Sequence, residues 1–171
     1  MKVVYGSPGG KMPSPMPAHT PGGRKVRIML VEDDGKELQK LQEALAAPHR
    51  EITAVHVSDI ETALKAFDAH DIVITDQDIG KGSGGEGQQL TKMIKKVRPQ
   101  TVVIINSAFP MVPQGLSELE PDFAHTKGIG SIVRKGERKS PLNLEGEICG
   151  GYEKLCGLVA EIERRQFKLA H

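Results

Sequence analysis

The stretch Asp71-Ile72-Val73-Ile74-Thr75-Asp76 decides the fold, because it is a short apolar run that ends in a carboxylate. Such runs are typical of strands buried on both faces of a parallel sheet. Three other runs also end in polar side chains: Val26–Val31 before Glu32-Asp33-Asp34, Thr101–Asn106 before Ser107, and Ser131–Arg134 before Lys135. Open α/β sheets bind ligands at the carboxyl ends of their strands. We therefore expect these groups to converge in a site for a metal ion and a phosphoryl group.

Helical patterns alternate with these runs and with a further expected strand at Ile52–Val57. Ser58 or Asp59 is expected to cap the helix that follows this strand. After the strand that ends at Asp76, four apolar residues at helical spacing are expected to face the core: Leu90, Met93, Ile94 and Val97. The alternation predicts an α/β fold, with a five-stranded parallel sheet in a (βα)5 doubly wound, flavodoxin-like arrangement and helices on both faces.

The chain divides into a tail, residues 1–24, and one domain, residues 25–171. The tail is rich in Pro and Gly and carries basic but no acidic residues, so we expect it to be disordered. It is either a solvated tail or an arm that docks on a partner. Within the domain, the connections at 109–130 and 136–147 exceed the usual lengths and are expected to be insertions beside the site.

The composition excludes some function classes. The 171 residues carry a net charge of +1, so no overall field favours nucleic acid or a membrane surface. No apolar stretch has the length of a transmembrane helix, and the N-terminus lacks the apolar region of a signal peptide. Cys149 and Cys156 are expected to be core thiols in a reducing compartment. We expect a soluble, cytoplasmic protein.

The residue types at the strand ends suit phosphoryl chemistry. The carboxylates of Glu32, Asp33 and Asp76 would repel one another and recruit a cation, and an all-oxygen site suits Mg²⁺. Asp76 could then attack a phosphoryl group as a nucleophile. Lys135 would offer a positive charge to a phosphoryl oxygen, and the hydroxyl of Ser107 would donate a hydrogen bond to another. Asp34 and Asp78 are expected to lie around this site.

In order and type, these positions resemble the receiver domains of two-component response regulators. The resemblance covers about residues 25–168, and two stretches carry it most closely: Ile28-Met29-Leu30-Val31-Glu32-Asp33-Asp34 and Ile74-Thr75-Asp76. It implies that Asp76 is the phosphoacceptor and that Ser107 and Lys135 assist it. It also implies Mg²⁺ bound by Glu32, Asp33, Asp76 and the backbone carbonyl of Asp78.

The resemblance further implies a function and partners. A histidine kinase or a His-containing phosphotransfer protein would donate the phosphoryl group, and a downstream protein target would read the resulting conformational change. We expect a stand-alone receiver that acts as a switch and is not a turnover enzyme, with neither nucleic acid nor a membrane as its partner.

Three features depart from the family pattern. Receivers usually have Lys-Pro after the fifth strand, where this chain has Lys135-Gly136. An aromatic residue often precedes that Lys by three positions, where this chain has Ile132. After the phosphoacceptor, the usual hydrophobic-Pro pair is replaced by Ile79-Gly80 and a glycine-rich loop.

Two other functions remain as alternatives. A pseudo-receiver would keep the fold as a protein-interaction module without phosphorylation. A phosphohydrolase of the haloacid-dehalogenase type would use Asp76-Gln77-Asp78, but its metal-binding acidic pair would follow the Lys rather than precede the nucleophile. The glycines of 82–87 fit a dinucleotide-binding pattern, but they follow the third strand instead of the first.

Overall fold

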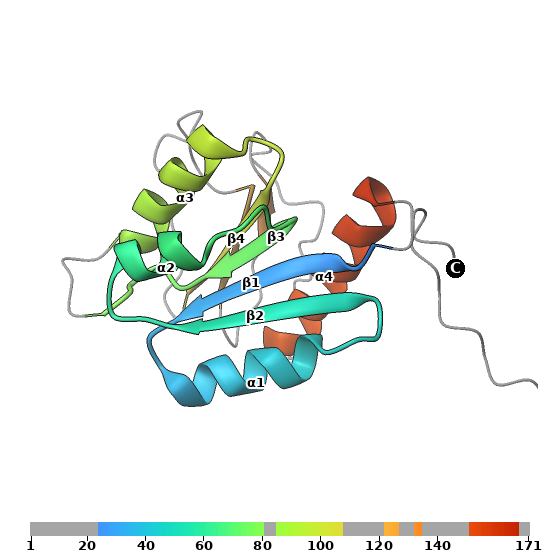
Figure 1. Cartoon of the computed structure of the whole chain (residues 1–171). Helices are drawn as coiled ribbons and strands as arrows, with labels where there is room; N and C mark the ends of the chain where they lie inside the picture. The colour runs from blue at the N-terminus through green and yellow to red at the C-terminus, as the bar shows by residue number, and fades with distance from the viewer. Residues whose placement is uncertain (1–23, 81–84, 108–121, 127–131, 135–150, 168–171) are drawn as a thin grey trace, which may run out of the picture.

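The computed structural model describes residues 24–80, 85–107, 122–126, 132–134 and 151–167. The tail expected at 1–24 lies outside these residues except for Arg24. The chain runs through ten elements: β1 (Val26–Glu32), α1 (Gly35–Leu45), β2 (Arg50–His56), α2 (Ile60–Ala66), β3 (Ile72–Thr75), α3 (Glu86–Val97), β4 (Val102–Ser107), β5 (Phe123–Thr126), β6 (Ile132–Arg134) and α4 (Gly151–Gln166). Figure 1 shows the sheet between two layers of helices.

The strands form one sheet in the order β2-β1-β3-β4-β5-β6. The first five are parallel, and β6 is antiparallel to β5. The predicted five-stranded parallel sheet in doubly wound order is therefore confirmed, and one antiparallel edge strand is added to it. β1 and β3 lie next to each other in the middle of the sheet, so their carboxyl ends are neighbours.

The identity of the fifth parallel strand was predicted wrongly. The position beside β4 is taken by β5, which comes from the stretch expected to be irregular, and the strand expected at Ser131–Arg134 is the antiparallel β6. β5 gives a weak apolar signal because it contains His125, which is buried and donates from Nδ1 to Oδ1 of Asn106 at 2.8 Å. A polar side chain can lie in a buried strand when a neighbouring strand satisfies it.

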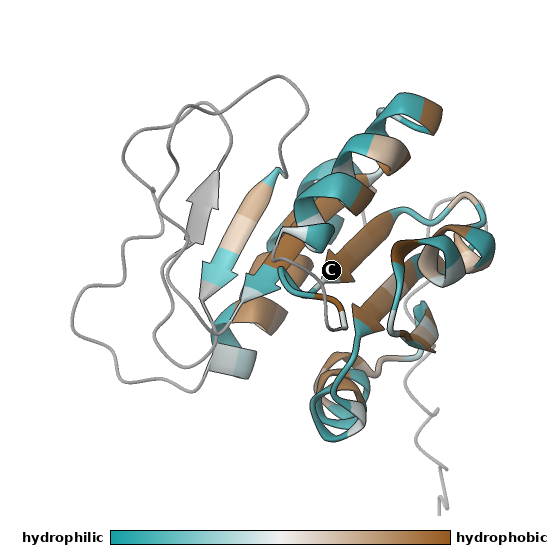
Figure 2. Cartoon of the chain, turned by 90° about the vertical axis from the view of Figure 1, so that its left-hand side faces the viewer, coloured by the Kyte–Doolittle hydropathy of each residue, from teal (hydrophilic) through white to brown (hydrophobic). Residues whose placement is uncertain are grey.

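Successive side chains along each strand point to opposite faces of the sheet, so they enter two separate cores. On one face, α1 and α4 cover a core of Val26, Ile28, Leu30, Leu38, Leu41, Leu45, Ile72, Ile74, Val102, Ile104, Leu155, Leu158, Val159 and Ile162. On the other face, α2 and α3 cover Met29, Val31, Val57, Ala63, Val73, Ile79, Leu90, Ile94 and Val103. Figure 2 shows the apolar central strands between helices with hydrophilic outer surfaces.

The helices begin largely where the sequence predicts. Asp59 accepts a hydrogen bond from the backbone N–H of Thr62 and caps α2, as expected. The prediction for α3 is partly wrong: Leu90 and Ile94 are buried, but Met93 and Val97 are 45% and 77% exposed. The buried stripe of α3 runs through Gly87 and Thr91 instead. Within the described residues, none of the helices is long and apolar enough to cross a membrane.

Candidate metal centre

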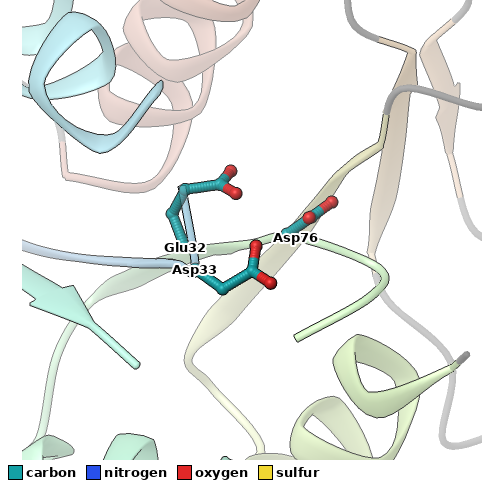
Figure 3. A group of neighbouring side chains, drawn as sticks. All are labelled: Glu32, Asp33 and Asp76. Carbon is teal, nitrogen blue, oxygen red and sulfur yellow. The ribbon is translucent and has the colours of Figure 1, made fainter. Parts of the chain in front are cut away.

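Three carboxylates gather at the carboxyl edge of the sheet, as predicted. Glu32 is the last residue of β1, Asp33 follows it, and Asp76 follows β3. One oxygen from each lies within 4.8 Å of the others, and Figure 3 shows the three side chains grouped at the strand ends. Glu32 is 1% exposed, while Asp33 and Asp76 are half-buried. The cluster therefore combines one buried carboxylate with two that solvent partly reaches.

The parallel pairing of β1 with β3 places Asp76 beside Glu32. Leu30 lies opposite Ile74, and the backbone N–H of Asp76 donates to the carbonyl of Val31 at 3.0 Å. The ladder therefore extends as far as the phosphoacceptor candidate itself. Since backbone hydrogen bonds set this register, the approach of the carboxylates does not depend on long flexible side chains.

Two contacts hold the turn that carries Asp33. Its Oδ2 accepts a hydrogen bond from the backbone N–H of Gly80 at 2.9 Å, and its carbonyl accepts one from Nε2 of His56 at 2.8 Å. Gly80 has a φ of +76°, and a Cβ there would lie 2.3 Å from the carbonyl oxygen of Ser58. Only glycine fits this position without strain. The loop after β3 and the turn after β1 are thus joined around the site.

The beginning of α3 packs directly behind Asp76. The backbone N–H of Gly87 donates to the carbonyl of Gln77 at 2.9 Å, and a Cβ on Gly87 would lie 2.2 Å from the carbonyl oxygen of Asp76. The side chain of Asp76 accepts at Oδ1 from the N–H of Gln77 at 2.8 Å. The positive end of the α3 dipole therefore lies close to the carboxylates and partly offsets their charge.

The remaining oxygen-bearing candidates have separate roles. Ser107 ends β4, is 2% exposed and lies opposite Thr126, at the same edge as the carboxylates. Asp34 accepts from the N–H groups of Lys36 and Glu37 and is the cap of α1. The side chain of Asp78 is exposed and accepts from the N–H of Gly85 at 3.2 Å. That the carbonyl of Asp78 completes a metal shell stays a prediction.

The strand expected to carry Lys135 to the site runs in the opposite direction from the one predicted. Lys135 itself lies outside the described residues, but Arg134 before it lies opposite Phe123, at the start of β5. Because β6 is antiparallel, it ends at the edge of the sheet away from Asp76. The register of β6 therefore gives no support to the expected role of Lys135, which stays a prediction.

A different lysine follows the parallel strand beside β4. β5 is parallel to β4 and ends at Thr126, which lies opposite Ser107, and the next residue in the chain is Lys127. Lys127 is also outside the described residues. The signal that could have found it is a Lys-Gly sequence directly after four residues with some strand character, Phe123–Thr126.

The cluster fits a hard cation. Carboxylate oxygens are the ligands preferred by Mg²⁺, which keeps several waters and asks for few protein groups. The negative field extends to α4, where burial raises the pKa of Tyr152 together with a hydrogen bond to Glu37 and the charges of Glu32 and Asp34. The residues present would hold Mg²⁺ through Glu32, Asp33 and Asp76.

The fold and site together define a doubly wound α/β protein with three carboxylates gathered at the carboxyl edge of its sheet. The sequence matches no protein-family model and no curated protein. Among solved structures it is similar to the Francisella response regulator 1452 receiver domain, with a TM-score of 0.57 and 19% identity over 82% of this chain and 98% of that one. It is also similar to the response regulator TrrA from Thermotoga maritima in complex with Mg²⁺-BeF, with a TM-score of 0.50 and 27% identity over 59% and 85%. The chain has the fold of a response regulator receiver domain.

Proposed function

We propose that this receiver is a phosphoacceptor in which Asp76 takes one phosphoryl group in the presence of Mg²⁺. The observation that supports this most is the approach of Glu32, Asp33 and Asp76 to within 4.8 Å at one end of β1 and β3. Three carboxylates this close are costly without a cation, and a cation so placed would also attract phosphate oxygens. TrrA, which this chain resembles, has been solved with Mg²⁺-BeF, and this suits the same metal here.

In the proposed reaction, a carboxylate oxygen of Asp76 attacks the phosphorus of a phosphohistidine on the partner. The O–P bond of an acyl phosphate forms as the N–P bond breaks, and the leaving imidazole keeps the electron pair of that bond. Bound Mg²⁺ would offset the charge of the phosphoryl oxygens. Glu32 and Asp33 hold the cation, and the N–H of Gln77 orients Asp76 through its hydrogen bond to Oδ1.

Two further side chains are assigned to the phosphoryl oxygens. The hydroxyl of Ser107, at the end of β4, donates to one oxygen. Lys127, which follows the strand next to β4, supplies the positive charge first expected from Lys135. We assign this role to Lys127 instead of Lys135 because β5 runs parallel to β4, so its carboxyl end lies at the edge that carries Asp76.

We assign the chain a switching role and not that of a turnover enzyme. Phosphorylation adds about −1.5 to −2 charges to a site that already holds three carboxylates. The new charge would favour conformations that bring donors toward it and would bias a two-state equilibrium read by a downstream protein. A histidine kinase or a His-containing phosphotransfer protein is the proposed donor.

The test is phosphorylation by a small-molecule phosphodonor such as acetyl phosphate, followed by intact mass. We expect one added phosphate with Mg²⁺, none with a chelator, and none in Asp76→Asn. Asp78→Asn is the matched control, because its exposed carboxylate lies two residues away and caps a loop. Lys127→Ala should lose most of the modification and Lys135→Ala should keep it.

Other outcomes would redirect the assignment. No phosphate under any condition, together with Mg²⁺ affinity unchanged in Asp76→Asn, would favour the pseudo-receiver. Sustained turnover of a generic phosphomonoester, lost in Asp76→Asn, would favour the phosphohydrolase. Retention of the phosphate in Lys127→Ala and its loss in Lys135→Ala would show that the lysine assignment is wrong.

A further inference from the structure

The outer face of α3 carries an unusual combination of side chains. Met93 and Val97, at 45% and 77% exposure, are the two large hydrophobic side chains left exposed in the described part of the chain. They lie one helical turn apart, so their side chains are neighbours on one face. A single exposed apolar residue is ordinary, but here both fall on the same stripe of one helix.

The stripe is regular and basic. We define the α3 outer face as Gln89, Lys92, Met93, Lys96 and Val97, which are all exposed and follow the spacing i, i+3, i+4, i+7, i+8. Neither Lys92 nor Lys96 forms an ion pair within the residues that the structure describes. The single acidic residue of α3 is Glu86, in its first turn, so the middle and end of the face are positive.

The stability of the fold does not explain why apolar side chains lie on this exposed face. Val97 is β-branched, has a modest helix propensity, and gains little from burial at 77% exposure. The buried stripe of Gly87, Leu90, Thr91 and Ile94 already fills the space between α3 and the sheet. The core therefore does not need the side chains of Met93 and Val97.

We propose that the α3 outer face is a docking surface for an acidic amphipathic helix of a partner protein. Two apolar side chains of that helix, four residues apart, would cover Met93 and Val97, and flanking Asp or Glu side chains would pair with Lys92 and Lys96. Helix faces are recognised in this way through anchors at i and i+4. The long thioether side chain of Met93 adapts to varied partners, and the aliphatic stems of both lysines extend the apolar area.

Charge and size favour this occupant over two others. A second copy docking through the same face would bring Lys92 and Lys96 against each other, which is unfavourable in a symmetric contact. An anionic membrane would attract the lysines, but α3 has only 12 residues and two apolar side chains to insert. The surface lies on the exposed side of α3, opposite the buried stripe of Leu90, Thr91 and Ile94.

The experiment uses the full chain, labelled with ¹⁵N, and a synthetic helical peptide with leucines four residues apart flanked by glutamates. A peptide of the same composition, scrambled so that the leucines no longer share a face, is the probe control. We expect saturable binding of the patterned peptide, measured by anisotropy, with amide shift changes centred on α3. Lys92→Glu/Lys96→Glu should weaken binding by about tenfold or more, and Met93→Ser/Val97→Ser should do the same.

The matched control is Lys36→Glu/Lys40→Glu, which reverses two exposed lysines four residues apart on α1. It should bind like the wild type. Circular dichroism should show that all variants keep the wild-type melting temperature within a few degrees. Equal weakening in the α1 control, shift changes away from α3, or equal binding of the scrambled peptide would overturn the proposal. So would binding to phosphatidylserine–phosphatidylcholine vesicles without binding to the peptide.

Discussion

The two faces of the sheet are built in different ways. The face under α1 and α4 has the larger core, and α4 is tied to β2 by a buried ion pair. Arg50 donates from Nε and Nη2 to the two carboxylate oxygens of Glu163, each at 2.7 Å, and from Nη1 to the carbonyl of Leu45. The face under α2 and α3 has the smaller core, close glycine contacts and exposed apolar side chains.

This difference between the two faces predicts that substitutions on them have different effects on stability and on the carboxylate site. On the α1/α4 face, the Arg50–Glu163 pair lies at the start of β2, opposite Val26, whereas the carboxylates lie at the other end of β1. The α2/α3 face abuts Asp76 through Gly87, so a change in its packing reaches the carboxylates directly. A substitution on the first face should therefore lower stability, whereas one on the second should lower stability and metal affinity together.

The largest expected effect tests the α1/α4 face. Glu163→Gln leaves the Arg50 guanidinium, only 9% exposed, without its charged partner, and breaking such a pair costs about 3–5 kcal/mol. Chemical denaturation should show this loss in the free energy of unfolding. Mg²⁺ affinity, measured under conditions where the variant is folded, should remain close to that of the wild type.

The matched control is Glu161→Gln on the same helix. Glu161 pairs with Arg164 and Arg165 at the surface, where ion pairs contribute little, so the unfolding midpoint should hardly move. Equal destabilisation by the two substitutions would remove the special role of the buried pair. A large loss of Mg²⁺ affinity in folded Glu163→Gln would contradict the separation of the two faces.

A smaller effect on stability, joined to an effect on the site, is expected from Gly87→Ala. The new Cβ would lie 2.2 Å from the carbonyl oxygen of Asp76, so α3 must move away from the loop. Such overpacking costs about 1–3 kcal/mol, and displacement of groups behind a metal ligand typically weakens metal binding by about tenfold or more. Denaturation and Mg²⁺ titration calorimetry measure the two losses.

Gly157→Ala, in α4, is the control for this change. A Cβ at that position meets nothing within 4 Å, so the better helix propensity of Ala should stabilise the protein by about 0.5–1 kcal/mol. Its Mg²⁺ affinity should not change. If Gly87→Ala behaves like Gly157→Ala in both measurements, the close contact behind Asp76 does not constrain the site.

Most of the fold on the α2/α3 side and around the carboxylates was predictable from local sequence. The central residues of β1, β3 and β4 are apolar, and Glu32, Asp33 and Asp76 lie at or just after the carboxyl ends of β1 and β3, so the register places the cluster. Met93 and Val97 were misplaced, because helical periodicity marks an apolar arc but does not say how wide a core the sheet presents. That width depends on side chains from β1 and β3, far away in sequence.

The proposal that Lys127 completes the candidate site could not be reached from local sequence in the same way. β5 is four residues long and contains His125, whose hydrogen bond to Asn106 is a contact between strands that the local sequence does not reveal. β6 carries a stronger apolar signal but pairs antiparallel at the edge. Strand direction depends on this long-range pairing, and it decides whether Lys127 or Lys135 follows the edge that carries Asp76.

The smallest expected effect is confined to low pH and to the α2/α3 face. His70 is buried, its Nδ1 accepts from the backbone N–H of Asp68 at 3.2 Å, and its Nε2 donates to Oγ1 of Thr53 at 3.1 Å. Burial lowers the pKa of His70 from its ordinary value of 6.5, with a further contribution from the charge of Arg27. The folded state therefore favours the neutral ring.

The sign of the pH dependence follows from that direction. Below pH 6.5 the unfolded chain binds a proton at His70 more readily than the folded chain. The free energy of unfolding therefore decreases as the pH is lowered, until the pH lies below the lowered folded-state pKa of His70. His70→Asn keeps an acceptor near the Nδ1 position and has no such titration. We expect the difference in unfolding free energy between the wild type and His70→Asn to be constant above pH 7 and to shift against the wild type as the pH falls below 6.5. A pH-independent difference, or an NMR-titrated pKa of His70 above 6.5, would show that this ring is not held neutral by the packing of α2 against the sheet.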